Sequence, residues 1–432
     1  MSNNLKYGSL DIAYSFTVVF LPFLYLFKGI GNSFSLGELL VMIPLLIACI
    51  NDVAKQRKLR VDGSLLLFYF VVFVTSLFSI ANAYFVISKF MTILFRLLFY
   101  ALLILFGRFH FHVEIVYKAY TFSVLCFSAY LVLQYVYFQL NNGYLPIYLH
   151  YSWQFPPEAR PESLAQYYKW SFRPASLFLE PGYFCLFVTP NIILNLFMKN
   201  RSGMEGFSLV FALVAVVLSG SGAGIISLSL ILGVYIFSST ANSSGLQISV
   251  RLLFIVLIIV VGYLYLRYSA SGSDSVSRIS DGGSFNQRVT RGLIIFRQLP
   301  FQHQIWGVGL NNLGAYMSRY GISTIYDETN LNYAASIIQV GLFSGIIGLA
   351  SLLIYLGTLL ARTVHAMKVM TSQSLRPACL IAMYLYLIVI LSYEAVLFSY
   401  RFAFVLIIFE ATIRFVKGNS SHHISEHLRS RL

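Results

Sequence analysis

The sequence predicts an all-α, polytopic integral membrane protein. Of its 432 residues, 58% are hydrophobic and 11% are charged, and the mean hydropathy is +0.75. Soluble domains carry about 25% charged residues. The apolar residues form runs, each near the ~20 residues that an α-helix needs to cross a bilayer. We therefore expect a single integral membrane domain over residues 1–432, surrounded by the lipid bilayer.

About twelve apolar runs are expected to be transmembrane helices. They cover residues 10–27, 36–50, 64–84, 89–106, 115–138, 181–198, 207–220, 222–238, 250–268, 334–360, 377–393 and 397–416. The two runs that meet at Ser219-Gly220-Ser221-Gly222 are compatible with a tight helical hairpin or with a single broken element.

Basic residues recur between the apolar runs and give the chain a net charge of +14. This is the positive-inside pattern, in which Lys and Arg collect in short cytoplasmic loops. If both termini are cytoplasmic, all the short basic segments fall on one side. Their residues are Lys55, Arg57, Lys58, Arg60, Arg108, Lys199, Arg201, Arg362, Lys368, Arg376, Lys417, Arg429 and Arg431. Because the charge is not gathered in one patch, we expect no nucleic-acid partner.

The four cysteines all lie inside apolar runs, and none has the spacing of metal ligands. They are Cys49, Cys126, Cys185 and Cys379. Such cysteines are typical small hydrophobic residues. The sequence therefore predicts no metal site, no disulfide framework and no cofactor.

Two long connections then lie on the outer side of the membrane. They cover residues 139–180 and 269–333. Long loops in a compact protein are usually functional, so we expect the functional site there.

The first outer loop ends in a conspicuous pair of charges. Pro181 is expected to open the span 181–198, because proline fits the first turn of a helix. Glu180 would then lie at a helix N-terminus, where the dipole favours a carboxylate. Two interpretations are open. Glu180 could simply cap the helix and pair with Arg173, or Arg173 could bind a phosphate while Glu180 orients or deprotonates a hydroxyl.

The second outer loop is rich in arginine, and topology does not explain this. Its arginines are Arg278, Arg288, Arg291, Arg297 and Arg319. The stretch 289–299 is amphipathic and is expected to lie along the membrane surface. Its arginines are either merely solvated or form a clamp for an anionic, phosphorylated ligand, since the guanidinium group has a fixed fork of donors.

Further candidates follow along the same loop. Two glycines separated by one residue allow a tight turn close to a ligand. An Asn-x-Asn-Tyr segment leads into the span 334–360, and one histidine on this side could serve as a base. The candidates for substrate binding are therefore Gly307, Gly309, His303, Asn330, Asn332 and Tyr333.

Charged residues at three further positions are also of interest. Arg96 lies within the span 89–106, where an ionisable residue is costly and marks a candidate functional site; a structural ion pair is the alternative. Glu394 and Arg401 flank the short outer turn before the last span and are candidates for the outer site.

Together these features resemble the O-antigen polymerase (Wzy-type) and ligase superfamily of bacterial polysaccharide enzymes. Three segments carry the resemblance, in addition to the number of spans and the two large loops. They are Arg173-x-x-x-x-x-x-Glu180-Pro181, then Arg288 followed by Gly307-x-Gly309, and then Asn330–Tyr333 before Gly341 and Gly348. The ligase branch usually has a histidine just before the last of these spans. Here Thr329, Asn330 and Asn332 stand there, which favours a polymerase.

The resemblance implies a GT-C-like fold and a metal-independent, inverting glycosyltransferase in the bacterial inner membrane. Such enzymes transfer a glycan from undecaprenyl pyrophosphate to another lipid-linked repeat unit on the periplasmic side, and a chain-length regulator is a candidate partner. By this resemblance Arg173, Arg288 and Arg291, with Arg96 and Arg278, would bind the pyrophosphate, and Glu180 would act on the acceptor hydroxyl. The alternatives are an O-antigen ligase and a flippase for the lipid-linked repeat unit. A flippase is expected to have more charge within its spans and shorter outer loops.

Overall fold

The computed structural model describes residues 8–29, 34–55, 61–141, 143, 145–146, 173–178, 180–240, 286–320, 334–370 and 375–429. Within these ranges the fold is all-helical, apart from isolated bridges between Lys28 and Ser35 and between Met198 and Leu375. The helices are α1 (Ser9–Leu24), α2 (Leu36–Ala54), α3 (Gly63–Phe78), α4 (Ile87–His110), α5 (Val113–Asn141), α7 (Pro181–Phe197), α8 (Gly203–Leu218), α9 (Gly222–Thr240), a π-helical turn η2 (Asn286–Thr290), α12 (Arg291–Gln298), α13 (Phe301–Trp306), α14 (Leu313–Arg319), α15 (Ser336–Lys368), α16 (Ala378–Tyr393) and α17 (Tyr400–Arg429).

Every expected span within the described ranges coincides with a helix, and the expected span 250–268 lies outside them. The four helices α2, α4, α5 and α15 are long and apolar enough to cross a membrane. The apolar helices α1, α3, α7, α8 and α16 are shorter. The chain is thus an all-α membrane protein. The runs around Ser219–Gly222 form two helices joined by a turn at Gly220, whose φ is +61°.

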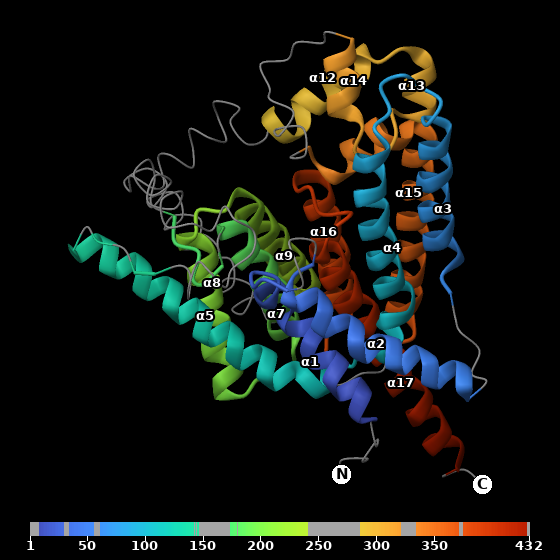
Figure 1. Ribbon diagram of the computed structural model, residues 1–432. Helices are drawn as coiled ribbons and strands as arrows, with labels where there is room; N and C mark the ends of the chain where they lie inside the picture. The colour runs from blue at the N-terminus through green and yellow to red at the C-terminus, as the bar shows by residue number, and fades with distance from the viewer. Residues whose placement is uncertain are drawn as a thin grey trace.

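The helices are arranged around α17 (Figure 1). It packs against α1, α4, α5, α7, α15 and α16. The short helices α12, α13 and α14 lie together over one end of α3 and α15, and we call this the site end. Helix α1 begins, and α17 ends, toward the opposite end (Figure 1).

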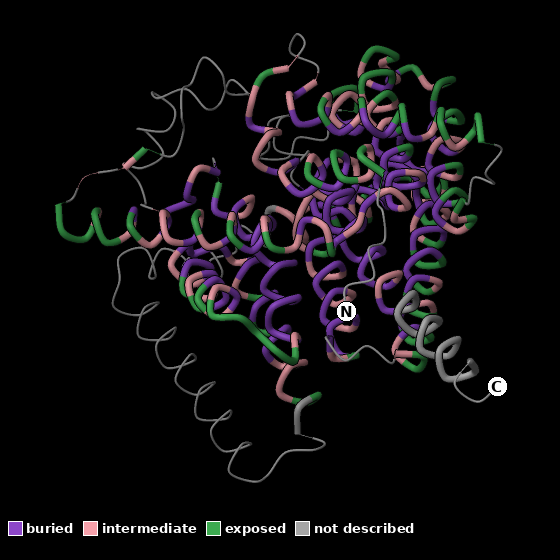
Figure 2. Tube along the Cα trace, turned by 90° about the horizontal axis from the view of Figure 1, so that it is seen from below, coloured by how far each residue is buried: buried purple, intermediate pink, exposed green. Residues whose placement is uncertain are grey.

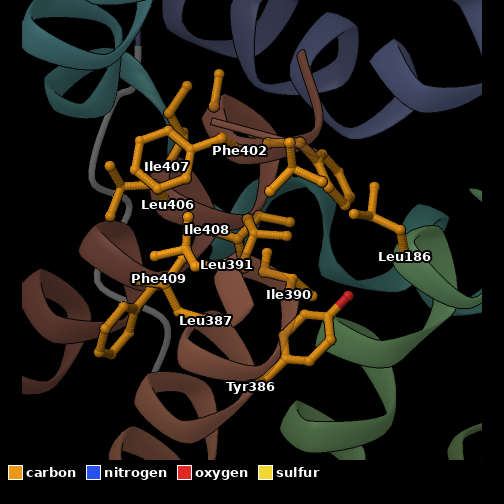
Figure 3. Packing of buried hydrophobic residues seen from close by; sticks show 14 of the residues in the cluster. Leu186, Tyr386, Leu387, Ile390, Leu391, Phe402, Leu406, Ile407, Ile408 and Phe409 are labelled. Atoms are coloured by element: carbon orange, nitrogen blue, oxygen red, sulfur yellow. The ribbon is translucent and has the colours of Figure 1, made fainter. Parts of the chain in front are cut away.

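The core is the interface of α17 with α7 and α16 (Figure 3). The run from Phe402 to Phe409 is buried at every position, which is the pattern of a helix surrounded on all sides. Phe184 to Phe197 in α7 is buried throughout in the same way. These two helices can therefore position charged residues at their first turns with little freedom to move.

Exposed residues lie along the outer helices (Figure 2), and many of them are large and apolar. Examples are Ile50 in α2, Phe70 in α3 and Leu140 in α5, which are 66%, 61% and 77% exposed. A soluble protein avoids extended apolar surface of this kind. The backbone of each helix satisfies its own hydrogen bonds, so this surface is suited to contact lipid.

A glycine-dependent joint connects α13 to α15. The φ of Gly345 is +65°, and this breaks α15 after its first turns. Gly307, with φ +80°, lies so close that a Cβ atom there would be 2.2 Å from the Phe343 carbonyl. The amides of Val308 and Gly309 donate to the Leu342 and Phe343 carbonyls at 3.0 Å. The break thus frees carbonyls of α15 for the Gly-x-Gly segment.

A network of ion pairs lies at the opposite end. Arg362 lies 2.9 Å from Asp62 and 2.8 Å from Glu410, and Arg108 lies 3.3 Å and 3.5 Å from the same two carboxylates. From the sequence, both arginines are expected in loops. They instead lie within α4 and α15, because these helices continue past the expected ends of the spans. The network joins α4, α15 and α17 to the start of α3.

Candidate functional site

Two segments far apart in the sequence meet through an ion pair at the site end. The Arg288 guanidinium lies 2.5 Å from a carboxylate oxygen of Glu394, and the same oxygen is 3.9 Å from Arg401. Arg288 comes from η2, Glu394 follows α16, and Arg401 lies in the first turn of α17. One carboxylate therefore faces two guanidinium groups, so the positive charge is only partly neutralised.

Backbone hydrogen bonds hold these segments in place. The Ala335 amide donates to the Arg288 carbonyl at 2.8 Å. The Ser336 hydroxyl donates to the Glu394 carbonyl at 2.7 Å and accepts from the amides of Val396 and Leu397 at 2.9 and 3.1 Å. The start of α15 thus connects η2 to the turn between α16 and α17, and this fixes the side chains before any ligand arrives.

Glu180 lies beside this ion pair, at the N-cap position of α7, with Pro181 at the first helical position as expected. Its side chain makes no capping hydrogen bond, so the interpretation of Glu180 as a simple cap is not supported. A Cβ atom on Gly182, two residues later, would lie 3.8 Å from a Glu394 carboxylate oxygen.

The surroundings of Glu180 perturb its ionisation. The residue is exposed to solvent on one side, yet the protein around it is dense. Desolvation raises the pKa of the Glu180 carboxyl above its usual range, and the negative charge of Glu394 adds to this rise. The positive charges of Arg401, Arg288 and Arg173 lower it without cancelling the effect. A carboxyl with a raised pKa is better suited to accept a proton near neutral pH.

Arg173 is the third arginine whose charge acts on Glu180. Its guanidinium donates to the Gly220 carbonyl at 2.9 Å, in the turn between α8 and α9. Its charge acts on the Glu180 carboxyl, although the two side chains form no direct ion pair among the residues that the structure describes. The expected simple pairing of Arg173 with Glu180 is therefore not found.

Aromatic rings support two of the arginines. The Arg288 guanidinium lies 5.6 Å from the ring centre of Tyr393 and donates to its carbonyl at 3.3 Å. The Arg401 guanidinium lies 5.0 Å from the ring of Tyr183 and donates to the Ala395 carbonyl at 3.1 Å. Rings at these distances stabilise a cation and fix its orientation.

We call the five charged residues the arginine–glutamate group: Arg173, Glu180, Arg288, Glu394 and Arg401. It combines three permanent positive charges with two carboxylates, one of which is already paired. Guanidinium groups held in this way bind phosphate oxygens through paired hydrogen bonds. The free carboxylate can act as a general base beside them.

The other predicted site residues lie elsewhere or outside the described ranges. Arg291 begins α12 and is partly buried, one helical turn after Arg288. Arg96 lies in α4, where its charge acts on the Tyr100 hydroxyl, and Tyr100 in turn donates to Glu38 of α2. Arg278, Asn330, Asn332 and Tyr333 fall in segments that the structure does not describe.

Three predicted substrate-binding residues have structural contacts. Gly307 and Gly309 pack against the break in α15, as described above. His303 lies among aromatic rings, with its centroid 5.7 Å from that of Tyr84 and 5.1 Å from that of Tyr316. Its Nδ1 lies 3.2 Å from the Gly307 carbonyl oxygen. These contacts account for the three residues as parts of the α13 joint.

The sequence analysis missed the aromatic support. Tyr183 and Tyr393 carry no motif, because tyrosine is common throughout this chain. The one signal for Tyr183 is its position two residues after Pro181, and the one signal for Tyr393 is its position directly before Glu394.

Among the described residues, no group of three or more His, Cys, Asp and Glu side chains is placed to hold a metal ion. Comparison of the chain with protein-family models and with curated proteins finds no match.

Proposed function

We propose that this protein is a polysaccharide polymerase of the bacterial inner membrane. In this proposal it joins oligosaccharide repeat units of O-antigen or capsule, each carried on undecaprenyl pyrophosphate, at the periplasmic face. The arginine–glutamate group is the observation that carries the proposal. It gathers an anion-binding set of guanidinium groups and an unpaired carboxylate at one end of a membrane-embedded helix bundle.

The chemistry of the reaction requires these two kinds of group. The oxygen of an acceptor hydroxyl attacks the anomeric carbon of the donor glycan, and the bond from that carbon to the pyrophosphate breaks, with inversion. The hydroxyl proton passes to the Glu180 carboxylate. Negative charge develops on the departing lipid pyrophosphate, and in this proposal Arg173, Arg288 and Arg401, whose charges all act on Glu180, stabilise it.

Fixed arginines would carry the role that a bound metal ion has in other transferases. Their stabilisation is effective because the donors are oriented before the reaction begins. In this group Ser336 and the two tyrosine rings restrict Glu394, Arg288 and Arg401. The Nε atoms of Arg173 and Arg401 are shielded from solvent and have no hydrogen-bond partner within the described ranges, so these two arginines are not fully satisfied by the protein.

The membrane setting forms part of the same proposal. We infer about twelve spans in a GT-C-like arrangement, with both termini cytoplasmic and the site end facing the periplasm. The positions of the helices and the basic segments between them support this orientation. A chain-length regulator remains a proposed partner.

The proposal is tested by glycan laddering in a deletion strain. The strain is complemented with wild type, Glu180→Gln, Arg288→Ala, or the control variants Glu114→Gln and Lys118→Ala. Both control residues are exposed and lie outside the arginine–glutamate group. We expect the deletion to leave a single capped repeat unit, and the wild type and both controls to restore the ladder. At equal membrane abundance, Glu180→Gln and Arg288→Ala should not restore it.

Other outcomes would favour the alternatives. Loss of all glycan from the final acceptor, single repeat units included, would indicate an O-antigen ligase or a flippase. Transport of lipid-linked repeat units by the purified protein in liposomes, without linkage between them, would select the flippase. An unchanged ladder in the deletion strain would contradict the assignment as a polymerase.

A further inference from the structure

An open apolar groove lies between α1 and α5, outside the arginine–glutamate group. Its volume is about 440 Å³, within the range of ligand pockets in proteins. Five phenylalanines dominate its lining, with Cys126 among them. These phenylalanines are Phe16, Phe20, Phe23, Phe122 and Phe127. None of the described residues that line the groove is charged, so the groove suits a hydrocarbon.

The groove is open toward the surface that faces lipid. Phe16 and Phe122 are 37% and 57% exposed, although they line the cavity. The two helices are in contact along part of their length, yet they leave this space unfilled. From Phe16 to Leu24 the groove follows α1 for about two helical turns, roughly 12 Å at the rise of an α-helix. It can therefore take a short portion of a long chain.

One end of the groove reaches the arginine–glutamate group through aromatic contacts. The rings of Phe23 and Phe127 lie 6.1 and 5.2 Å from that of Phe178, which is two residues before Glu180. Immediately beyond the groove, Tyr25 stacks on Tyr400 at 4.0 Å, and Tyr400 adjoins Arg401. The end of the groove at Phe23 and Phe127 thus lies near the arginine–glutamate group, with the buried rings of Phe178 and Tyr400 between them.

We propose that this groove holds the isoprenoid chain of the lipid carrier, in the portion next to its pyrophosphate. This inference rests on the proposed function and assigns the tail of the same substrate. A ligand with an anionic head and a hydrocarbon tail matches the order of the two surfaces, with arginines at one end and phenylalanines at the other. The rest of the chain would extend into the bilayer through the open side.

Cys126 makes the occupancy measurable. It is a free, exposed cysteine in the groove, whereas Cys185 and Cys379 are buried. Cys49, in α2, is partly exposed and does not line the groove, so it serves as an internal control. The full-length protein in phosphatidylcholine nanodiscs is treated with N-ethylmaleimide, and modification of each cysteine is followed by mass spectrometry. The added probes are undecaprenyl pyrophosphate, inorganic pyrophosphate and phosphatidylglycerol.

We expect undecaprenyl pyrophosphate at ten times its Kd to slow modification of Cys126 by about tenfold. It should leave the rate of modification of Cys49 unchanged. Inorganic pyrophosphate and phosphatidylglycerol should protect neither cysteine. Equal protection of Cys126 by phosphatidylglycerol would overturn the proposal, since the groove would then hold ordinary membrane lipid. A third outcome separates the two proposals. If undecaprenyl pyrophosphate binds and Arg288→Ala weakens that binding, but Cys126 is not protected, the assignment of the groove is overturned and the proposed function is not. No binding at all would contradict both.

A second variant tests the groove without relying on the cysteine. Ser123→Trp fills the cavity from α5, and Leu140→Trp adds the same side chain to an exposed position on the same helix. Ser123→Trp should weaken binding of undecaprenyl pyrophosphate by about tenfold or more. It should leave binding of inorganic pyrophosphate unchanged, and Leu140→Trp should affect neither. Equal affinity of Ser123→Trp and wild type for undecaprenyl pyrophosphate would contradict the assignment.

Discussion

The Arg288 guanidinium lies 2.5 Å from the Glu394 carboxylate, and this contact joins the arginine-rich outer segment to the turn between α16 and α17. Both side chains are about four-fifths buried. The pair therefore has two roles. It holds η2 against the helix bundle, and it sets how much positive charge remains for a ligand.

The first prediction concerns the energy of this pair. Arg288→Ala, Glu394→Ala and the double variant are compared by thermal unfolding in detergent. Each single change leaves a partly buried charge without its partner, so the two effects should not add. We expect a coupling energy of roughly 0.5–3 kcal/mol between the two positions. Strictly additive effects would show that the contact contributes nothing to stability.

The second prediction concerns the pH dependence of glycan transfer. Glu180 must be deprotonated to accept the hydroxyl proton, so activity should rise with pH through its pKa. Because that pKa is raised, the rise should occur above the ~4.3 of an ordinary glutamate. Glu180→Gln should remove the rise and lower the rate by about 10²–10⁴-fold. A pH profile of Glu180→Gln that keeps the acidic limb would assign the base to another residue.

The third prediction concerns the effect of Glu394 on the pH at which activity rises, which is the acidic limb of the pH profile. The negative charge of Glu394 contributes to the raised pKa of Glu180. Glu394→Gln removes that charge, so the acidic limb should shift to lower pH. Glu114→Gln, at the opposite end of the bundle, should leave the limb where it is. The measurement is the pH profile of kcat/KM in proteoliposomes, and a shift to higher pH in Glu394→Gln would be inconsistent with the arrangement.

The fourth prediction concerns the ion network at the opposite end. Glu410→Ala leaves Arg108 and Arg362 facing only Asp62, and Arg108 is deeply buried. We expect a loss of about 3–5 kcal/mol in unfolding free energy. The rate per folded molecule should not change, because the network lies far from Glu180. A selective loss of rate at unchanged stability would connect the two ends functionally.

The same network should respond to acid. Burial raises the pKa of the Asp62 carboxyl, but hydrogen bonds from Ser64 and Leu65 and the charges of Arg362 and Arg108 leave it lowered. The stability that Asp62 contributes is therefore present above its unfolded pKa of ~3.9 and is lost as the pH falls through its folded pKa. Asp62→Asn should flatten this acid limb of the unfolding curve.

The fifth prediction compares two glycines in α15. A Cβ atom at Gly345 would lie 2.1 Å from the Ile305 carbonyl oxygen, and the backbone has positive φ. Gly345→Ala should therefore destabilise the protein by at least about 1–3 kcal/mol. Nothing lies within 4 Å of a Cβ atom at Gly357, so Gly357→Ala should stabilise the helix by about 1 kcal/mol. Thermal unfolding distinguishes them, and equal effects would exclude the proposed joint.

The sequence could predict the helices because each apolar run is a local signal. It could also place Arg173, Glu180 and Arg288 near one end, since all three fall in the two long loops expected on the outer side. It could not predict that Glu394 pairs with Arg288, because that contact depends on how α15 and α16 pack. The composition of a span gives no information on its neighbours.

The Gly-x-Gly segment shows a different limit. The sequence could predict positive φ at Gly307 and Gly309, but it could not predict which part of the protein this conformation brings into contact. The sequence predicts that these glycines bind a ligand. In the structure Gly307 lies against the backbone of α15, and Gly309 lies against Ser79 while its amide donates to the Phe343 carbonyl. The break at Gly345 was hidden because Gly341 and Gly348 are ordinary helical positions in the same run.

That break also separates two helical phases. Residues 336–344 are tied by Ser336 to the turn that carries Glu394, while the longer part of α15 carries Arg362. Inserting one residue into a continuous helix turns everything beyond it by about 100°. Here the two parts of α15 are held by different contacts: Ser336 fixes the first part beside Glu394, and Arg362 fixes the second part beside Asp62 and Glu410. Because the joint at Gly345 is closely packed against α13, a one-residue insertion after it should disturb both the ion network and the arginine–glutamate group.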